Sequence, residues 1–459
     1  MRFSASVLLA TVSAMVSSVS ASSCSYVDGN YYCDSVSAVV YSGIGYSGSY
    51  SDVTDMDEDS CSCSQETVKF SGTMSPLDEE LSVHFRGPLQ LLQFGVYYPS
   101  GSSAKKLAKR EEECTTTAHV HHKHKRAYEY VEVTATVFVD QHGNTITKSE
   151  SSTLTSSSSS SAETSSTEAS STESSTESSS EASSTQASST ESSESSASAS
   201  STESSATSSS TYSAGSWERV SYFEPGSTDN VTFLNTLGGT TSSGTWSSCF
   251  GNSLSYCASN GEDASSSAEA LNKVTIPSDT EYMIFSGSDC SDSSVGDCGY
   301  YRSGIPAYHG FGGASKIFVF EFEMPTASSS ESDSSNYDMP AIWLLNAKIP
   351  RTLQYGDSSC SCWSTGCGEL DLFEILSSGS DKLISHIHDG QGDNGSKSGG
   401  AGSQDYFDRP TSSSLKAAAI FENGEVHIVV LDDDTDFGSS LDSDTVSTWL
   451  DVTGGSASL

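Results

Sequence analysis

Short apolar runs at close spacing dominate the C-terminal half of the chain. Gly, Ser and Asp fill the gaps between these runs, and the one short helical candidate is Ser267–Lys273. Many strand-length runs separated by turn residues predict an all-β sandwich or jelly roll. Asn423-Gly424 lies between two of the runs and predicts a hairpin turn. The predicted strands are Lys316–Met324, Met339–Asn346, Gly368–Leu376, Lys382–His388, Leu415–Glu422 and Glu425–Leu431.

Residues 22–100 are rich in Tyr, Gly and Ser and contain three further strand-like runs. Turn signals of Gly, Pro and Ser separate the runs. This pattern predicts a small β domain at the N-terminus, closed by a Cys24–Cys33 disulfide and by bridges from Cys61 and Cys63. The three runs are Thr67–Gly72, Leu81–Phe85 and Leu91–Tyr98.

Residues 101–146 form a basic segment with two dibasic pairs, Lys109-Arg110 and Lys125-Arg126. The pairs look like sites for a kexin-type processing protease. The four histidines between them could bind a metal ion, but a metal site needs a scaffold that holds its ligands, so we favour an exposed cleavage segment. Tyr128–Asp140 alternates Val, Thr and Tyr and predicts one strand. The histidines are His119, His121, His122 and His124.

Residues 147–215 are almost all Ser and Thr, with recurring S-S-T-E units. Such a tract has too few apolar side chains to offset the chain entropy lost on folding. We therefore expect a disordered, O-glycosylated stalk. It would separate two independently folded parts, residues 22–100 and the jelly roll of residues 216–459.

Residues 1–21 predict a secretory signal with a positive start, the apolar core Val7–Val16 and the small-residue cleavage site Val19-Ser20-Ala21. No apolar run is long enough to cross a membrane, and the C-terminal sequence lacks the hydrophobic tail of a lipid-anchor signal. Asn230 and Asn394 begin N-glycosylation sequences. We therefore expect a protein that is secreted or held in a cell wall, without a membrane anchor.

Twelve cysteines in a secreted chain predict disulfides. Five precede the Ser/Thr tract and seven follow it. Odd numbers on both sides predict a free thiol or a bridge between the two halves, and the sequence leaves the pairing open.

The chain is strongly acidic, with a net charge of −39 and a pI near 4.3. This charge argues against a nucleic acid or an anionic membrane as partner. A neutral polysaccharide meets no such repulsion. We expect a monomer that acts on a polymer of this kind.

Gly368–Leu376, with the sequence G-E-L-D-L-F-E-I-L, places three acids in an otherwise apolar run. Alternate side chains of a strand point to opposite faces, so Glu369 and Asp371 share a face that Glu374 would leave. One β-bulge at Leu372–Phe373 returns Glu374 to the face of the other two. Like charges this close raise a pKa, and the apolar flanks argue against a solvated acidic edge. The pattern therefore predicts that the three carboxyls act together at a functional site.

Two resemblances give these acids a context. D-M-P-A-I-W-L-L-N, a cysteine-bearing loop with Trp363, and G-E-L-D-L-F-E are similar to the catalytic region of family 16 glycoside hydrolases, whose motif is Glu-x-Asp-x-x-Glu when it contains a bulge. Three other segments resemble a fungal cell-wall family, the Tos1-like proteins, which combine a glycine-rich N-terminal domain, a Ser-rich linker and a glucanase-like domain. These segments are Leu81–Leu89, Trp217–Phe223 and Tyr406–Pro410.

The resemblance implies a retaining endo-β-1,3-glucanase on a β-jelly roll, which uses no metal or organic cofactor. Glu369 would be the nucleophile and Glu374 the general acid/base. Asp371 would orient the nucleophile and help to set the pKa difference. Retaining glycosidases hold two carboxyls about 5–5.5 Å apart, whereas four steps of a straight strand span roughly 13 Å. The bulge, strand twist and side-chain reach must therefore bring the two glutamates together.

Five more residues are candidates for binding the sugar. Trp363 matches a tryptophan that precedes the family motif and is the first candidate for an aromatic platform. Trp343 lies in an apolar strand and fits the core equally well. Asn346 ends that strand and could bond a hydroxyl, and His386 and His388 alternate onto one face of the next strand.

Two alternative functions use the same sequence features. A transglycosylase would pass the glycosyl group to another glucan or to chitin with the same three acids. A non-catalytic wall protein would depend only on the glycine-rich domain and the stalk. The group of three acids argues against the second alternative, because a purely structural domain has no need for convergent carboxyls.

Overall fold

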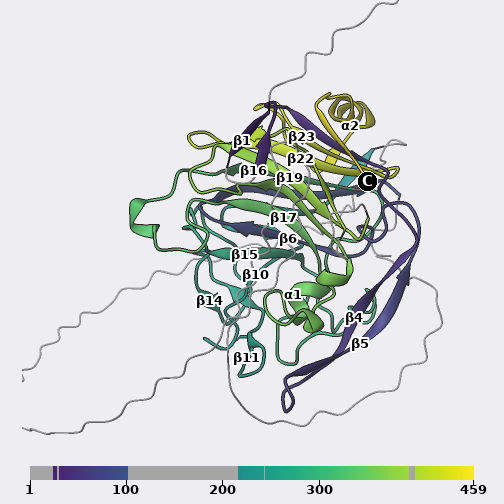
Figure 1. Cartoon of the computed structure of the whole chain (residues 1–459), viewed down its shortest axis with the longest axis vertical. Helices are drawn as coiled ribbons and strands as arrows, with labels where there is room; N and C mark the ends of the chain where they lie inside the picture. Colours follow the sequence, from purple (N-terminus) through teal and green to yellow (C-terminus); the bar gives the residue numbers. More distant parts are fainter. Residues whose placement is uncertain (1–23, 28–29, 102–215, 242, 392–398) are drawn as a thin grey trace, which may run out of the picture. The chain divides into compact units, whose positions relative to one another are not determined.

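The computed structural model describes residues 24–27, 30–101, 216–241, 243–391 and 399–459 (Figure 1). Two large sheets dominate this part of the chain, which confirms the all-β prediction. The first sheet has the order β14-β13-β10-β15-β6-β17-β18-β19-β20, with β21 also paired to β19. Its strands are β6 (Leu81–Arg86), β10 (Val231–Asn235), β13 (Ser255–Cys257), β14 (Ala264–Ser265), β15 (Glu281–Ser286), β17 (Ala341–Asn346), β18 (Glu369–Glu374), β19 (Lys382–His388), β20 (Ala401–Gly402) and β21 (Phe407–Asp408).

The second sheet has the order β24-β8-β7-β16-β22-β23-β3-β25, with β9 paired to β8. Its strands are β3 (Ala38–Ser42), β7 (Gln90–Pro99), β8 (Trp217–Glu224), β9 (Ser227–Asp229), β16 (Lys316–Glu323), β22 (Leu415–Glu422), β23 (Glu425–Val430), β24 (Ser440–Leu441) and β25 (Gly455–Ser458). Three two-stranded ribbons and five short helices complete the described chain. They are β1 (Ser25–Val27) with β2 (Asn30–Tyr32), β4 (Gly48–Asp57) with β5 (Ser62–Phe70), β11 (Trp246–Ser247) with β12 (Gly251–Asn252), α1 (Lys348–Thr352), α2 (Ser443–Leu450), and the 3-10 helices η1 (Ser329–Glu331), η2 (Ser358–Cys360) and η3 (Trp363–Thr365).

The main core lies between the two sheets. Phe85 and Leu370 of the first sheet share one apolar cluster with Phe94 and Phe318 of the second. The outer face of the second sheet is covered too, because Trp449 of α2 joins another cluster with residues of β16 and β22. Burial on both faces explains the nearly continuous apolar run of β16, since a strand with one solvated face alternates instead.

The N-terminal strands are interior members of both sheets. β6 lies between β15 and β17, and β7 lies between β8 and β16. The prediction of a separate N-terminal β domain is therefore wrong. A strand pattern does not specify the partner strand, and the change of composition at residues 101–215 suggested a domain boundary where the fold has none.

The segment 102–215 lies outside the described residues, but the chain ends on either side of it are neighbours. Pro99 of β7 pairs with Trp217 of β8, and the Ser100 amide donates to the Ser216 carbonyl at 2.8 Å. The long segment thus connects two paired antiparallel strands. Such an insertion is tolerated because the entropy cost of closing a loop grows slowly with its length.

Five disulfides link the described cysteines. Cys24–Cys33 is as predicted, and two bridges, Cys61–Cys249 and Cys63–Cys360, join residues before the Ser/Thr tract to residues after it. The buried Cys257 is a free thiol, so both consequences of the odd cysteine numbers occur. The other two bridges are Cys290–Cys298 and Cys362–Cys367.

Local predictions have mixed outcomes. Asn423 and Gly424 have φ of 55° and 84° between β22 and β23, as the predicted hairpin turn requires. Ser267–Lys273 is not helical, so that prediction is wrong. No helix among the described residues is long and apolar enough to cross a membrane. The signal, the basic segment with its histidines, the Tyr128–Asp140 strand, the stalk and Asn394 lie outside the described residues.

Candidate active site

A β-bulge in β18 places the three acids on one face of the first sheet. Trp343 and Ile342 are adjacent on β17 and pair with Asp371 and Phe373 of β18. Leu372 lies between these two partners, so it is the extra residue of the bulge. The register against β19 shifts at the same place. The predicted bulge is therefore confirmed. Leu370, Leu372 and Phe373 are fully buried in the main core, and this leaves the opposite face to the carboxyls. We call this face, with its neighbours on β6, β15, β17 and β19, the acidic face.

The three carboxyls affect each other's protonation. Burial raises the pKa of Glu369 to about 7, with Glu374 acting in the same direction. Burial, Glu369 and Glu374 raise the pKa of Asp371 well above its ordinary value. Burial also raises the pKa of Glu374, although Arg86 opposes this shift. The group therefore retains protons near neutral pH, and general acid catalysis needs such a carboxyl.

Arg86 is a site residue that the sequence analysis missed. It ends β6, and its Nη2 lies 3.3 Å from Glu374 Oε1. The two side chains meet above Ala341, which pairs with both residues across β17 and carries only a methyl group. Arg86 Nε also donates to the Met339 carbonyl at 2.8 Å, which fixes the guanidinium. The available sequence signal was an arginine directly after the strand-like run Leu81–Phe85.

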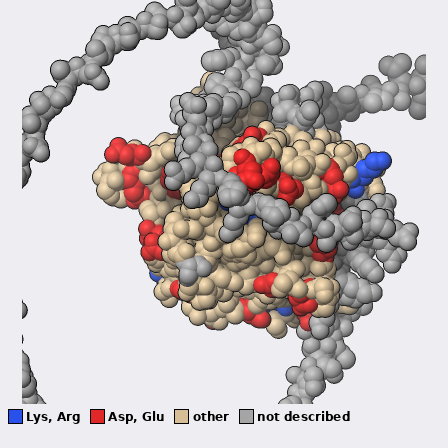
Figure 2. Space-filling model, turned by 90° about the horizontal axis from the view of Figure 1, so that it is seen from below, with Lys and Arg blue, Asp and Glu red and all other residues tan. Residues whose placement is uncertain are grey.

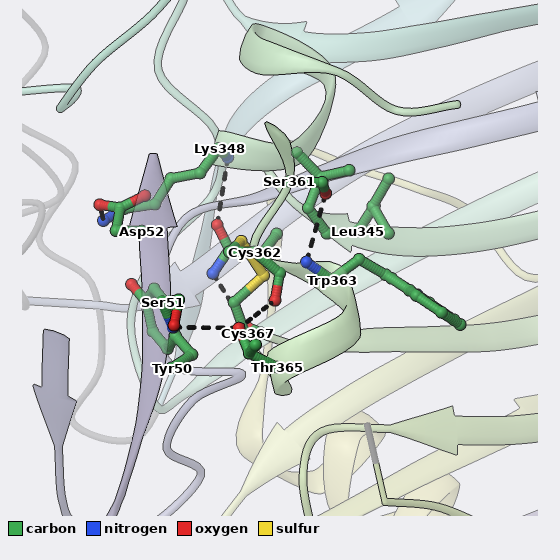
Figure 3. The surroundings of a disulfide bond; sticks show 12 residues. Tyr50, Ser51, Asp52, Leu345, Lys348, Ser361, Cys362, Trp363, Thr365 and Cys367 are labelled. Atoms are coloured by element: carbon green, nitrogen blue, oxygen red, sulfur yellow. Dashed lines mark hydrogen bonds and ion pairs between the residues drawn. A yellow bond between two sulfur atoms is a disulfide. The ribbon is translucent and has the colours of Figure 1, made fainter. Parts of the chain in front are cut away.

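Trp363 lies in η3, inside the small loop closed by Cys362–Cys367 (Figure 3). The residue is 39% exposed, and its Nε1 donates a hydrogen bond to Glu369. The loop is held from outside by β4, because the Ser51 amide donates to Thr365 Oγ1 at 3.0 Å. Trp363 points away from this contact (Figure 3), so the structure brings it to the acids.

The other aromatic candidates also reach the acidic face. His388 pairs with Glu369 and His386 with Asp371, and His388 Nε2 lies 3.7 Å from Asp371 Oδ2. Trp343 shares the face but is only 5% exposed, and it stacks on His84 of β6 at 5.1 Å between ring centroids. Trp343 therefore forms the floor beneath the acids.

Asn346 is not brought to the acids. Its side chain is buried, and its Nδ2 donates to Glu79 and to the Cys367 carbonyl at 3.1 and 2.9 Å. Its Oδ1 accepts from the Lys348 amide. These bonds occupy the polar atoms within the protein and hold the loop that leads to Trp363.

In the comparisons with known proteins, two family models match the chain, one on each side of residues 102–215. A family model described as "Cell wall protein YJL171C/Tos1, C-terminal" matches residues 215–449, and the corresponding N-terminal model matches residues 37–99. The chain is 55% identical to a Candida albicans protein named probable circularly permuted 1,3-beta-glucanase TOS1, over the whole of both chains. It is 53% identical to the Saccharomyces cerevisiae protein of the same name, over 100% of this chain and 99% of the relative. The chain belongs to the Tos1 family.

A third relative comes from Schizosaccharomyces pombe. It is named a probable circularly permuted 1,3-beta-glucanase and is 44% identical over 95% of this chain and 94% of its own length. No solved structure matches the chain. The resemblance to family 16 therefore stays a prediction.

Both segments matched by the family models contribute to the acidic face. β6 supplies His84 and Arg86 from the N-terminal segment, and β18 supplies the acids from the C-terminal one. Tyr41 of β3 adds support from behind. Its hydroxyl donates to Ser385 Oγ at 2.9 Å, and Ser385 donates to the Asp371 carbonyl at 2.5 Å.

Two clusters have metal-ligand spacing among the described residues. Cys290, Cys298 and His309 form the first, but its cysteines are joined in a disulfide and offer no thiolate. Asp371, Glu374 and His386 form the second, with ligand atoms within 4.8 Å of one another. The guanidinium of Arg86 beside Glu374 already supplies a positive charge there, which disfavours a cation.

Proposed function

We propose that this Tos1-family chain is a secreted cell-wall β-1,3-glucanase that cleaves internal bonds with retention of configuration. The observation that carries the proposal is the bulged strand β18, which directs three coupled carboxyls to one face. The names of the relatives indicate a 1,3-β-glucan as the polymer. A neutral glucan also suits a protein with a net charge of −39.

Glu369 is the nucleophile in this mechanism. Its carboxylate attacks the anomeric carbon to form a glycosyl ester, which water then hydrolyses. The hydrogen bond from Trp363 Nε1 orients Glu369 and favours its ionised form. Burial and the two glutamates raise the pKa of Asp371 well above its ordinary value, which suits it to donate a hydrogen bond to the nucleophile.

Glu374 is the general acid/base. It protonates the leaving oxygen in the first step and takes a proton from water in the second. Burial raises the pKa of Glu374 while Arg86 opposes the shift, and a raised pKa suits a carboxyl that must carry a proton in the first step.

The test uses purified protein and reduced laminarin oligosaccharides. Shorter products with retained configuration by NMR support the proposal, whereas longer products indicate a transglycosylase and no products indicate a structural protein. Glu369→Gln should lower turnover about 10³-fold or more without changing the circular dichroism spectrum or the melting temperature. Turnover at the unaltered level in this variant would refute the assigned mechanism.

A further inference from the structure

A second polar cluster adjoins Glu374 on the side of β6 and β15. Arg86 pairs across the strands with Glu281 of β15, and its Nη1 lies 4.0 Å from Glu281 Oε1. The Tyr355 hydroxyl donates toward both carboxylate oxygens of Glu281, at 3.1 and 2.9 Å. Glu374, Arg86, Glu281 and Tyr355 thus form a continuous polar row across the sheet.

Tyr355 has the features of a ligand platform. Tyr355 is 61% exposed. Its hydroxyl nevertheless forms a hydrogen bond to Glu281, whose side chain is only 14% exposed. Tyr355 lies between α1 and η2, and the Cys63–Cys360 disulfide fixes the end of this segment to β5. A large exposed ring that is held in place presents a flat apolar surface at little entropic cost on binding.

The loop between β17 and β18 therefore carries two exposed aromatic residues with different partners. Trp363 donates a hydrogen bond to Glu369. Tyr355 donates a hydrogen bond to Glu281, which lies next to Arg86 and therefore close to Glu374. In the proposed function, Glu369 bonds to the sugar that stays on the enzyme and Glu374 protonates the sugar that leaves. Tyr355 is thus associated with the leaving sugar, on the opposite side of the acids from Trp363.

We propose that Tyr355, Glu281 and Arg86 form the binding site for the glucosyl unit on the leaving-group side, which is also the site for an acceptor sugar. This inference rests on the proposed function. The Tyr355 ring packs against the C–H face of the sugar, and Glu281 and Arg86 bond its hydroxyls. When an acceptor reacts, its hydroxyl proton passes to Glu374 as its oxygen bonds to the anomeric carbon and the ester to Glu369 breaks.

Two glycosyl donor substrates test this binding site separately from the catalytic residues. Laminaripentaose must place a sugar on the leaving-group side, whereas β-laminaribiosyl fluoride releases only a fluoride ion and leaves that side empty. Tyr355→Ala should lower kcat/KM for laminaripentaose about tenfold. Fluoride release should stay within about twofold of the unaltered protein, since one lost contact outside the reacting sugar leaves donor binding intact.

Two further variants sharpen the comparison. Tyr355→Phe keeps the ring and loses the bond to Glu281, so its loss with laminaripentaose should be smaller than that of Tyr355→Ala. Tyr26→Ala is the matched control, because Tyr26 is 55% exposed and lies on β1, in a ribbon that pairs with neither large sheet. It should change neither reaction.

Four results would overturn the inference. An equal loss with both donors would place Tyr355 on the donor side or in the fold, and no loss with either would show that the ring binds no sugar. A loss in Tyr26→Ala equal to that in Tyr355→Ala would mean that the effect is not local. If the unaltered protein neither releases fluoride nor shortens laminaripentaose, the proposed function falls and this inference with it.

Discussion

Glu369 and Glu374 come from one strand, yet their neighbours differ. Glu369 accepts a hydrogen bond from the uncharged indole of Trp363, whereas Glu374 faces the charged guanidinium of Arg86. Burial raises both pKa values, and the neighbours set how far each carboxyl departs from its ordinary behaviour. Such pairs of carboxyls in unequal surroundings divide the roles of nucleophile and acid.

Arg86 gives a prediction for pH dependence. The nucleophile must be ionised, so the acid limb of kcat/KM follows the pKa of Glu369, which is about 7 in the free protein. Arg86 lowers the pKa of Glu369 and of Glu374. Arg86→Met removes this cation, and the acid limb should move to higher pH by about one unit.

Arg86→Lys is the control for this experiment, because it keeps the positive charge and should keep the limb closer to its original position. The measurement is kcat/KM against pH for the three proteins with one oligosaccharide. A loss of rate in Arg86→Met without any movement of the limb would contradict the electrostatic effect of Arg86 on Glu369.

At the scale of elements, local patterns were sufficient for the strands of the C-terminal half. Apolar runs predicted β16, β17, β18, β19, β22 and β23 to within a few residues, because burial in a sheet selects side chains directly. The spacing of acids in β18 predicted the bulge, since plain alternation would have buried Glu374. Pairing partners could not be predicted, because β6 meets β15 and β17 through contacts that are remote in sequence. Arg86 was missed for the same reason.

The bulge of β18 can be tested by deletion. Removing Leu372 gives E-L-D-F-E, in which plain alternation keeps Glu374 on the face of Glu369 and Asp371 and opposite Ala341, beside Arg86. We expect turnover to persist at temperatures where the variant is folded, together with a lower melting temperature, because the deletion removes a fully buried leucine from the core.

Leu372→Ala separates the bulge from core packing. This variant should lose about 2–5 kcal/mol of stability for a fully buried leucine but retain turnover at temperatures where it is folded, because the extra residue is still present. Complete loss of turnover in the folded deletion variant, with Leu372→Ala still active, would contradict the assignment of Leu372 as the extra residue of the bulge.

At the scale of the whole molecule, charge and chain order have separate consequences. Figure 2 shows one face with several groups of Asp and Glu and few Lys or Arg. Seven of the 21 basic residues fall within residues 105–126, outside the described part of the chain. The sequence predicted this acidity and its neutral substrate class. It could not show that the acidic face of the first sheet, which carries the three acids of β18, is built from segments on both sides of residues 102–215.

Strands from near the two ends of the described chain meet in the second sheet. β25, close to the C-terminus, pairs in parallel with β3, close to the start of the described chain. Residues 102–215 in turn join two strands that pair at Pro99 and Trp217. The fold therefore does not depend on that connection to place β6 beside β17.

This arrangement predicts that the protein survives a cut between residues 101 and 216. A dibasic-specific protease acting at Lys109-Arg110 or Lys125-Arg126 would give two pieces. They should migrate together in a denaturing gel without reductant and separate after reduction, because Cys61–Cys249 and Cys63–Cys360 join them. Turnover should persist, since β6 and β7 remain paired on both sides and Arg86 stays beside Glu374.

Replacing Cys61 and Cys63 by Ser distinguishes the covalent link from the strand pairing. The cut pieces of this variant should separate in the denaturing gel even without reductant, yet elute together in size-exclusion chromatography under native conditions. Strand pairing predicts this because pulling out β6 and β7 would expose apolar residues such as Phe85 and Phe94, both fully buried. Pieces that part under native conditions, or a cut protein that loses turnover while still intact by chromatography, would mean that residues 102–215 do more than connect β7 to β8.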